Sequence, residues 1–333
     1  MLPFLKGIGG PTSFHNKFSG ALGQRGIYSH HDPLDPTCKT LLVIGGSRHL
    51  NVLWSARRRG VRIIQRLDGM NWIHRLRKTG LRHYLRSEVN NLILAVIRRY
   101  LSDAIIYQSR FVENHWNSQH SPISIPTTCI YNGVDLESYT PAGEGLPPQD
   151  HIRLLVVEGR LKGGHEVGLQ NAVSLAQSLQ EQTSRKVELM VAADVDPALQ
   201  TRYDQQKLIW ISWKNVLPRN EIPTLDRSAH LLFSAEVNAP CPNSVIEALA
   251  CGLPVVSYDT GSLPELVTKD AGALVPYGGN YKKLGPPDSQ ALAVAAKQVL
   301  TKLPHYRQGA RQRAETAFDL QSMTDAYLQF IFD

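Results

Sequence analysis

Strands and helices alternate through the second half of the sequence, and this alternation limits the fold more than any other feature. Apolar segments of strand length recur near residues 152–157, 187–191, 208–211, 231–234, 254–258 and 272–275. Helical segments fit the gaps between them. Because parallel strands need crossover connections of this length, the pattern predicts an α/β unit with a parallel sheet covered by helices on both faces.

The first half of the chain shows the same alternation. We expect strands at 2–5, 41–44, 61–67, 104–107 and 127–131. In the helical region that begins near His74, the spacing of Leu92, Ala95, Val96 and Tyr100 predicts one apolar helix face. The Pro- and Gly-rich run at 139–150 is typical of a linker. The sequence therefore predicts two domains, 1–140 and 150–333, each long enough to bury its own core.

Positive charge is concentrated in the first half. Residues 1–150 hold 18 Lys and Arg against 10 Asp and Glu, whereas residues 151–333 hold 18 against 19. Between Arg48 and Arg86, eleven basic residues accompany a single acid, Asp68. Such a face attracts phosphates, anionic lipid or nucleic acid, or is simply solvated. We do not expect nucleic acid, because the aromatic residues there, Trp54 and Trp72, form no known stacking motif.

The sequence also indicates where in the cell the protein is located and whether it binds a metal. No run of 18 apolar residues is present, and the start, MLPFLKGIGG, is too short and too broken by glycine for a secretory signal. We therefore expect a cytosolic protein that lies peripherally on the inner face of a membrane through its basic half. The four cysteines and twelve histidines lack the spacing of zinc ligands. The sequence predicts reduced thiols, no metal and no cofactor.

The stretch from Asn238 to Val267 joins a helix start, one carboxylate and a buried strand. Pro242 and Asn243 predict the helix start, with Asn243 as a cap. The helix that follows is apolar except for Glu247. A helix that begins beside the end of a parallel strand directs free N–H groups and a partial positive charge to one spot, which suits phosphate.

This stretch resembles the donor-nucleotide motif of family 4 glycosyltransferases, in CPNSVIEALACGLPVVSYDTGSLPELV at 241–267 followed by AGALV at 271–275. YNGVDLESYTP at 131–141 is similar to the segment between the two domains of that family, and VVEGRLKGG at 156–164 to the first loop of its second domain. The resemblance covers most of the chain. It implies the GT-B fold, in which two Rossmann-like domains face a central cleft with their parallel sheets and the last helix often returns to the first domain.

The resemblance also implies a set of donor-binding residues. Glu247 matches the family's ribose-binding glutamate, and Asn243 and Ser244 open its helix. Without the surrounding motif, Glu247 would be read as an exposed helix residue. Arg160 and Lys162 match the basic loop that neutralises the diphosphate, although the family's lysine usually lies further along, where this chain has Glu166.

One position departs from the family pattern. The family usually carries two carboxylates with seven residues between them, and Ala239 stands where the first would be. Either sugar recognition has moved to a neighbour, Asn238 or Glu236, or catalysis has been lost.

Two further candidates lie in the first half. The run GIGGPTS at 7–13 predicts a glycine loop between a strand and a helix, and in the resembled family this loop, here with Gly10, approaches the acceptor and the donor phosphates. Asp68 follows the predicted strand at 61–67, where α/β sheets place ligand groups. The alternatives are a plain tight turn at Gly10 and a turn aspartate at Asp68.

The resemblance implies a retaining glycosyltransferase of hexosyltransferase type, and the basic groups around the diphosphate would let it work without a metal. It would move a sugar from a nucleotide-diphospho-sugar to a glycan, lipid-linked or other acceptor. We expect Asp68, Arg160 and Lys162 to be catalytic, and the donor to contact Glu247, Asn243, Ser244, Gly10 and Asn238. Two alternatives remain open: a nucleotide-sugar-binding protein without turnover, and a GT-B sugar-nucleotide epimerase. The sequence does not specify the base, the sugar or the acceptor.

Overall fold

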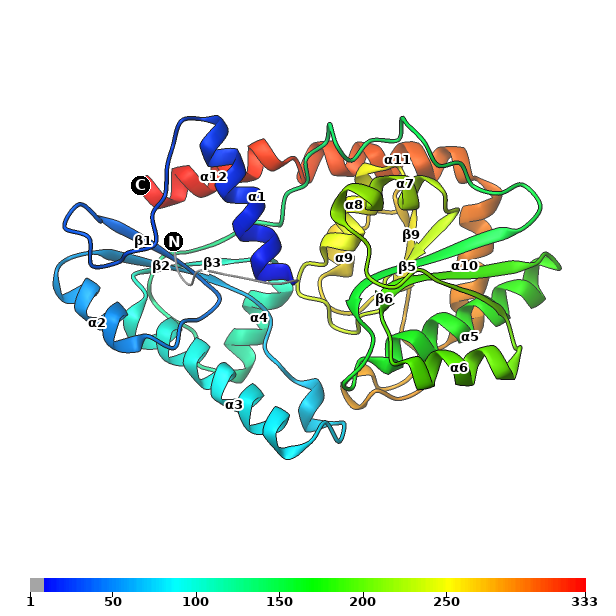
Figure 1. The fold of residues 1–333 in the computed structure, drawn as a ribbon, viewed down its shortest axis with the longest axis horizontal. Coiled ribbons are helices and arrows are strands. Elements are labelled where there is room, and N and C mark those ends of the chain that lie inside the picture. Colours follow the sequence, from blue (N-terminus) through cyan, green and yellow to red (C-terminus); the bar gives the residue numbers. More distant parts are fainter. Residues whose placement is uncertain (1–8) are drawn as a thin grey trace. The chain divides into compact units, whose positions relative to one another are not determined.

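The computed structural model describes residues 9–333 and contains two parallel sheets, each in its own unit (Figure 1). Unit 1 comprises the chain up to Gly133 together with Leu320–Asp333, and unit 2 comprises Val134–Asp319. The predicted strand at 2–5, and the first residues of the predicted glycine loop, lie outside the described residues.

The segment predicted to be a linker, 139–150, lies within unit 2. Tyr139 is buried, and its hydroxyl donates to the carbonyl oxygen of Arg219 at 3.3 Å. The guanidinium of Arg227 donates to the carbonyl oxygens of Thr140 at 3.1 Å and Glu144 at 2.6 Å. Proline and glycine therefore shape turns here that an arginine fixes in place, and the chain leaves unit 1 earlier, at Gly133.

The unit 1 sheet has the order β1-β2-β3-β4, with every pair parallel. Its strands are β1 (Thr40–Ile44), β2 (Arg62–Leu67), β3 (Ala104–Tyr107) and β4 (Thr127–Cys129). Helices α2 (Leu50–Arg58), α3 (Leu81–Val96) and α4 (Arg110–Gln119) connect them, and α3 continues into a π-helical turn, Ile97–Leu101. These four strands coincide, to within a few residues, with those predicted at 41–44, 61–67, 104–107 and 127–131.

Alternate residues of β1 pack on opposite faces of this sheet, as the two-residue period of a strand requires. Leu42 and Ile44 join the core under α1 (Gly10–Gln24) and α12 (Leu320–Phe332). Leu41 and Val43 join the core beneath α2. Figure 1 shows α1 and α12 together on one face of the sheet and α2, α3 and α4 on the other.

The unit 2 sheet has the order β10-β9-β8-β5-β6-β7 and is wholly parallel. Its strands are β5 (Ile152–Arg160), β6 (Val187–Asp194), β7 (Trp210–Trp213), β8 (Leu231–Phe233), β9 (Val255–Tyr258) and β10 (Gly272–Val275). From β5 the chain proceeds to β6 and β7 on one side, then returns to β8 and continues to β9 and β10 on the other. The connections after β5 and β8 therefore leave in opposite directions, which opens a crevice where such sheets bind ligands.

Seven α-helices are described in unit 2, besides two short 3₁₀ helices at Arg219–Glu221 and Tyr281–Lys283. They are α5 (Glu166–Thr183), α6 (Pro197–Gln206), α7 (Ile222–Arg227), α8 (Asn243–Ala250), α9 (Leu263–Leu266), α10 (Ser289–Thr301) and α11 (Leu303–Ala317). Helix α5 packs against α10, and α8 packs against α11 (Figure 1). The central strands β5 and β8 are buried between these layers, so the prediction of a parallel sheet covered on both faces is confirmed.

Candidate functional site

Two carboxylates meet at the carboxyl ends of β5 and β8. Glu158 lies near the end of β5, and Glu236 lies in the loop that follows β8. Burial raises the pKa of Glu158, and the charge of Glu236 raises it further, while the backbone N–H groups of Ala235 and Glu236 oppose the rise. Burial also raises the pKa of Glu236. The pair therefore holds a proton more strongly than exposed glutamates do.

Several buried polar atoms around this crevice lack a hydrogen-bond partner within residues 9–333. They are Glu158 Oε1, Ser234 Oγ, Asn238 Oδ1, Tyr258 Oη and Ser262 Oγ. Each belongs to β5, β8 or β9 near its carboxyl end, or to a loop that follows one of these strands. A buried polar atom without a partner is costly, and native proteins leave few of them. Polar atoms without a hydrogen-bond partner, from three neighbouring strands and their loops, therefore gather at one edge of the sheet.

The loop that carries Asn238 packs closely against the residues that follow β9. Asn238 has a left-handed backbone, with φ of 62°. A Cβ at Gly261 would lie 2.6 Å from both the N and the O of Ala239, so only glycine fits there. The N–H of Ser262 donates to the carbonyl oxygen of Ala239 at 2.9 Å. Ala239 is itself wholly buried, so a carboxylate at this position would have no access to solvent.

Helix α8 begins at Asn243, but the predicted side-chain cap is wrong. Pro242 occupies the cap position, and no side chain caps the helix. The proline backbone is extended there, with φ of −68° and ψ of 122°, which moves Asn243 and Ser244 into the first turn. Both side chains are half-buried. The N-terminus of α8 therefore carries no side-chain cap, and its partial positive charge suits an anion such as phosphate.

Glu247 lies one turn into α8 and is buried, with 8% of its surface exposed. This excludes the alternative of an exposed helix residue. Its charge is among the influences that raise the pKa of Tyr139 and of Asp226, for both of which burial is the larger cause. The apolar residues on either side of it in α8 are completely buried.

Arg160 and Lys162 occupy different settings. Arg160 is the last residue of β5 rather than part of the following loop, because the strand extends three residues beyond the predicted end. It is exposed and makes no ion pair in the part of the chain that the structure describes. The Nζ atom of Lys162 pairs with Oδ2 of Asp194 at 2.5 Å, so this side chain is turned toward the end of β6.

Asp68 directly follows β2 in unit 1, as predicted. Its Oδ1 accepts hydrogen bonds from Nη1 of Arg66, at 2.7 Å, and from Nε2 of Gln108. The indole of Trp116 donates to its carbonyl oxygen at 2.8 Å. Burial raises the pKa of Asp68, although the Arg66 charge and these hydrogen bonds oppose the rise. Its Oδ2 lies beside Gly45, where a Cβ would be 3.5 Å away.

Sequence reasoning missed Arg66, the residue that organises this site. Its side chain is completely buried, and it donates to Tyr327 Oη at 3.1 Å and to Asn132 Oδ1 at 2.6 Å. The guanidinium carbon also lies 4.0 Å from the ring centre of Phe14. Of the eleven basic residues between Arg48 and Arg86, nine are exposed, but Arg66 is not. Its position inside the apolar strand IIQRL was the available signal.

Gly10 is the first residue of α1, which begins four residues before the predicted helix at Phe14. The run GPTS therefore forms the first helical turn rather than a loop. A Cβ at Gly10 would meet no described atom within 4 Å. The described residues thus leave Gly10 open, with the N–H groups of the α1 N-terminus around it.

Residues 153–302 match the family model of glycosyl transferases group 1. Unit 2 is a glycosyl transferases group 1 domain. The matched segment contains the crevice between β5 and β8, Arg160, Lys162 and all of α8. No curated protein matches the sequence.

Solved glycosyltransferases share the fold of the chain. Sucrose-phosphate synthase from Thermosynechococcus elongatus is 16% identical with a TM-score of 0.67, over 98% of this chain and 80% of that chain. Anabaena HepE in complex with UDP-glucose is 17% identical with a TM-score of 0.61, over 87% and 78%. The pneumococcal O-GlcNAc transferase GtfA, with UDP and GlcNAc, is 15% identical with a TM-score of 0.62, over 88% of this chain and 57% of its own. The predicted GT-B fold is confirmed.

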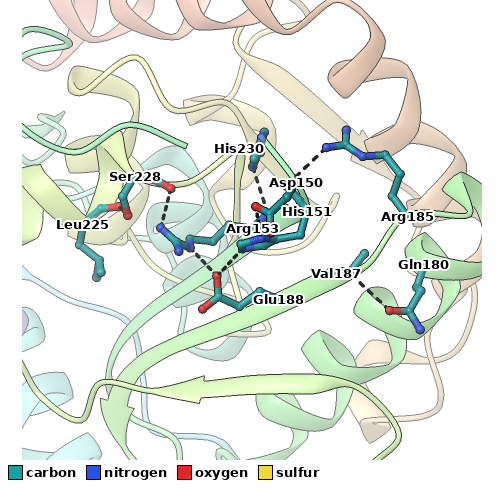
Figure 2. A network of polar contacts seen from close by, with 10 residues as sticks. All are labelled: Asp150, His151, Arg153, Gln180, Arg185, Val187, Glu188, Leu225, Ser228 and His230. Atoms are coloured by element: carbon teal, nitrogen blue, oxygen red, sulfur yellow. Dashed lines mark hydrogen bonds and ion pairs between the residues drawn. The ribbon is translucent and has the colours of Figure 1, made fainter. Parts of the chain in front are cut away.

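The opposite edge of the glycosyltransferase domain carries a buried polar network (Figure 2). Glu188 accepts from Arg153 Nε at 2.5 Å and contacts His151 Nε2 at 3.0 Å. The N–H of Arg153 donates to Nδ1 of His230 at 3.0 Å. Burial lowers the pKa of His230 to about 4, and the charge of Arg307 contributes. This network joins the amino ends of β5, β6 and β8, and it leaves His230 neutral at physiological pH.

A groove of about 590 Å³ lies beside this network, at the amino ends of β6 and β7. None of the predicted site residues lines it. Its three cations, Arg185, Lys186 and Lys207, follow the C-termini of α5 and α6, where positive charge stabilises a helix. We therefore assign these residues to helix stabilisation, and the carboxyl edge of the sheet remains the candidate functional site.

Within residues 9–333, no three His, Cys, Asp or Glu side chains gather where they could hold a metal ion. None of the helices in this part of the chain combines the length and the apolarity that crossing a bilayer requires.

Proposed function

We propose that the protein transfers a sugar from a nucleoside-diphosphate sugar to a hydroxyl-bearing acceptor, with retention of anomeric configuration and without a metal ion. The observation that carries this proposal is the set of unsatisfied polar atoms at the carboxyl edge of the glycosyl transferases group 1 domain. A sugar and a ribose present hydroxyl groups that can satisfy these atoms. Two proteins of the same fold were crystallised with UDP or UDP-glucose, which favours a UDP-sugar as donor.

The donor's nucleotide would bind at α8. The N-terminus of α8, which no side chain caps, suits the diphosphate through its partial positive charge. Glu247 suits the ribose diol because a carboxylate accepts two hydroxyl donors. Arg160, exposed and without an ion pair in the described chain, would neutralise the leaving diphosphate. Lys162 would first have to leave Asp194. Catalysis in this scheme is mainly electrostatic.

The donor's sugar would meet Glu158, Glu236 and Asn238. This assigns sugar recognition to neighbours of the wholly buried Ala239, which cannot accept a hydrogen bond through its side chain. Asp68 would act on the acceptor, since Arg66 and Gln108 fix its Oδ1 and leave its Oδ2 beside Gly45. The acceptor would be a glycan or a lipid-linked sugar, met by the basic unit 1 at an anionic cytoplasmic membrane surface.

A second candidate is a nucleotide-sugar-binding protein without turnover, and Ala239 is the observation that favours it. One assay separates the two: the chain is incubated with UDP-glucose and UDP-N-acetylglucosamine, with water or a glycan acceptor, and released UDP is measured. Release above the level of a Glu247→Ala variant supports transfer, and the anomeric signal of the product by NMR tests retention. Binding of the donor without any release would support the second candidate instead.

A further inference from the structure

Helix α3 carries a row of apolar residues on its exposed face, and only Leu94 of its three buried residues is apolar. Its outward side chains form what we call the α3 stripe: Leu81 (75% exposed), Leu85 (54%), Val89 (49%) and Leu92 (63%). The inward face includes Ser87 and Asn91, both buried. Leu92 and Tyr100, which the sequence placed on one apolar helix face, are therefore both exposed. A surface helix normally shows the reverse arrangement, with its apolar stripe toward the core.

Hydrogen bonds to the loop after β2 explain the polar inner face. Asn91 Oδ1 accepts from the N–H of Asn71 at 3.0 Å, and Asn91 Nδ2 donates to the carbonyl oxygen of Asn71 at 2.8 Å. Helix α3 is thus held on unit 1 without burying its stripe. At 100° per residue, the four stripe residues fall within an arc of about 80°, so they form one continuous apolar surface about 17 Å long. Such a surface marks an interaction site.

Positive charge surrounds this stripe. Arg77, Lys78, Arg82 and Arg86 are all exposed. The one acid between Gly69 and Ser102 is Glu88, and its charge is already matched. Arg75 donates to its two oxygens at 2.6 and 2.8 Å, and His74 contacts it at 2.7 Å. The surface around the stripe therefore attracts anions.

Two aromatic side chains are exposed on α2 and on the π-helical turn that follows α3. Tyr100, in the π-helical turn, is 64% exposed, and Trp54 of α2 is 48% exposed. Arg57 of α2 donates to the carbonyl oxygen of Tyr100, and Arg58 lies 5.2 Å from the ring centre of Trp54. Tyrosine, tryptophan and arginine in this combination are typical of a membrane interface.

We propose that α3 lies flat on an anionic lipid bilayer, with the α3 stripe in the boundary of the acyl chains and its flanking cations among the headgroups. This inference specifies the anionic surface of the proposed function and does not depend on sugar transfer. A second copy of the chain fits less well, because a two-fold contact through the stripe would bring Arg82 and Arg86 of both copies together. Lipid phosphates match these cations.

The test is co-sedimentation of the full chain with vesicles of phosphatidylcholine alone or mixed with phosphatidylglycerol. The variants are Leu85→Ser with Leu92→Ser, which removes half of the stripe, and Arg82→Ser with Arg86→Ser, which removes flanking charge. Leu146→Ser is the matched control, since Leu146 is 85% exposed in unit 2. Circular dichroism checks that each variant is folded.

We expect the natural protein to prefer anionic vesicles and the stripe variant to bind them at least tenfold more weakly, with the control unchanged. The charge variant should lose the preference for anionic vesicles. Equal binding by the stripe variant and the natural protein would overturn the proposal, because charge alone would then explain the binding to anionic vesicles. Absence of binding, or a dimer by light scattering that the stripe variant abolishes, would overturn it as well. Binding of UDP, measured separately, reports on the proposed function.

Discussion

The guanidinium of Arg66, completely buried, donates from Nη1 to Oδ1 of Asp68 across 2.7 Å. The same guanidinium also bonds Tyr327 of α12 and Asn132 after β4, so one buried cation fixes the acid at the end of β2. Deleting the Asp68 side chain would leave the buried Arg66 guanidinium without this partner, which is strongly destabilising. Asp68 is therefore held in one orientation by residues from distant parts of the sequence.

The first prediction concerns this acid. Asp68→Asn keeps an oxygen that Arg66 can bond but removes the charge, so we expect transfer to fall at least tenfold while UDP affinity stays unchanged. Steady-state transfer rates and calorimetric UDP binding measure the two effects. Gln108→Ala, which removes a hydrogen bond but keeps the charge, should retain more activity. Full activity in a folded Asp68→Asn variant would exclude a catalytic role.

The second prediction concerns Glu247. Glu247→Ala should weaken UDP binding by about 1.5–3 kcal/mol, the range for a hydrogen bond to a charged group, or roughly ten- to a hundredfold. Glu221→Ala, at an exposed position of the same unit, is the control. If both variants bind UDP as the natural protein does, Glu247 lies outside the site.

The third prediction concerns Glu158, whose pKa is raised by burial and by Glu236. Above the ordinary glutamate pKa of about 4.3 the native state binds more protons than the unfolded state, so its stability falls as pH rises toward the native pKa. Glu158→Gln removes this titration. Relative to the natural protein, the free energy of unfolding of the variant should rise by on the order of 1 kcal/mol from pH 5 to pH 8, as measured by urea unfolding. A constant difference between the two proteins at both pH values would contradict the raised pKa.

The fourth prediction concerns acid stability through His230. Its pKa is lowered to about 4 by burial, so the unfolded state takes up a proton below the ordinary value of 6.5 while the native state does not. The contribution of neutral His230 to the free energy of unfolding is present above pH 6.5 and is lost as the pH falls toward 4. His230→Asn keeps an acceptor for the N–H of Arg153 and removes the titration. On acidification, the variant should therefore lose up to about 3 kcal/mol less of its free energy of unfolding than the natural protein loses. Parallel unfolding curves for both proteins across this range would show that His230 does not titrate.

The periodicity of the sequence predicted the structural features that depend on residues close together in the chain. The strands β9 and β10, the end of α8 before Gly252 and the parallel order of both sheets follow from short apolar runs bounded by glycine and proline. Glu247 was singled out because the motif around it resembles a donor-nucleotide motif, whereas a lone carboxylate in an apolar helix would by itself be read as exposed. The cap at Asn243 was mispredicted because an adjacent proline with an extended backbone is an equally good entry to a helix.

What the sequence could not predict depends on contacts between distant residues. Arg66 was counted with the basic surface because its partners, Tyr327 and Asn132, are far from it in sequence. Glu158 was overlooked because only the neighbouring positions of β5 and β8 bring it to Glu236. The outward apolar face of α3 has the same helical period as an inward one, so the pattern alone could not give its direction.

The most direct test of the central claim, that the carboxyl edge of the unit 2 sheet holds a nucleoside diphosphate, is a calorimetric titration of the full chain with UDP, GDP and ADP. We predict one-to-one binding of UDP, with a Kd between about 1 μM and 1 mM, the usual range for enzyme substrates, and much weaker binding of the other two. Glu247→Ala should reduce the UDP signal. A folded chain that binds none of the three at millimolar concentration would contradict the account.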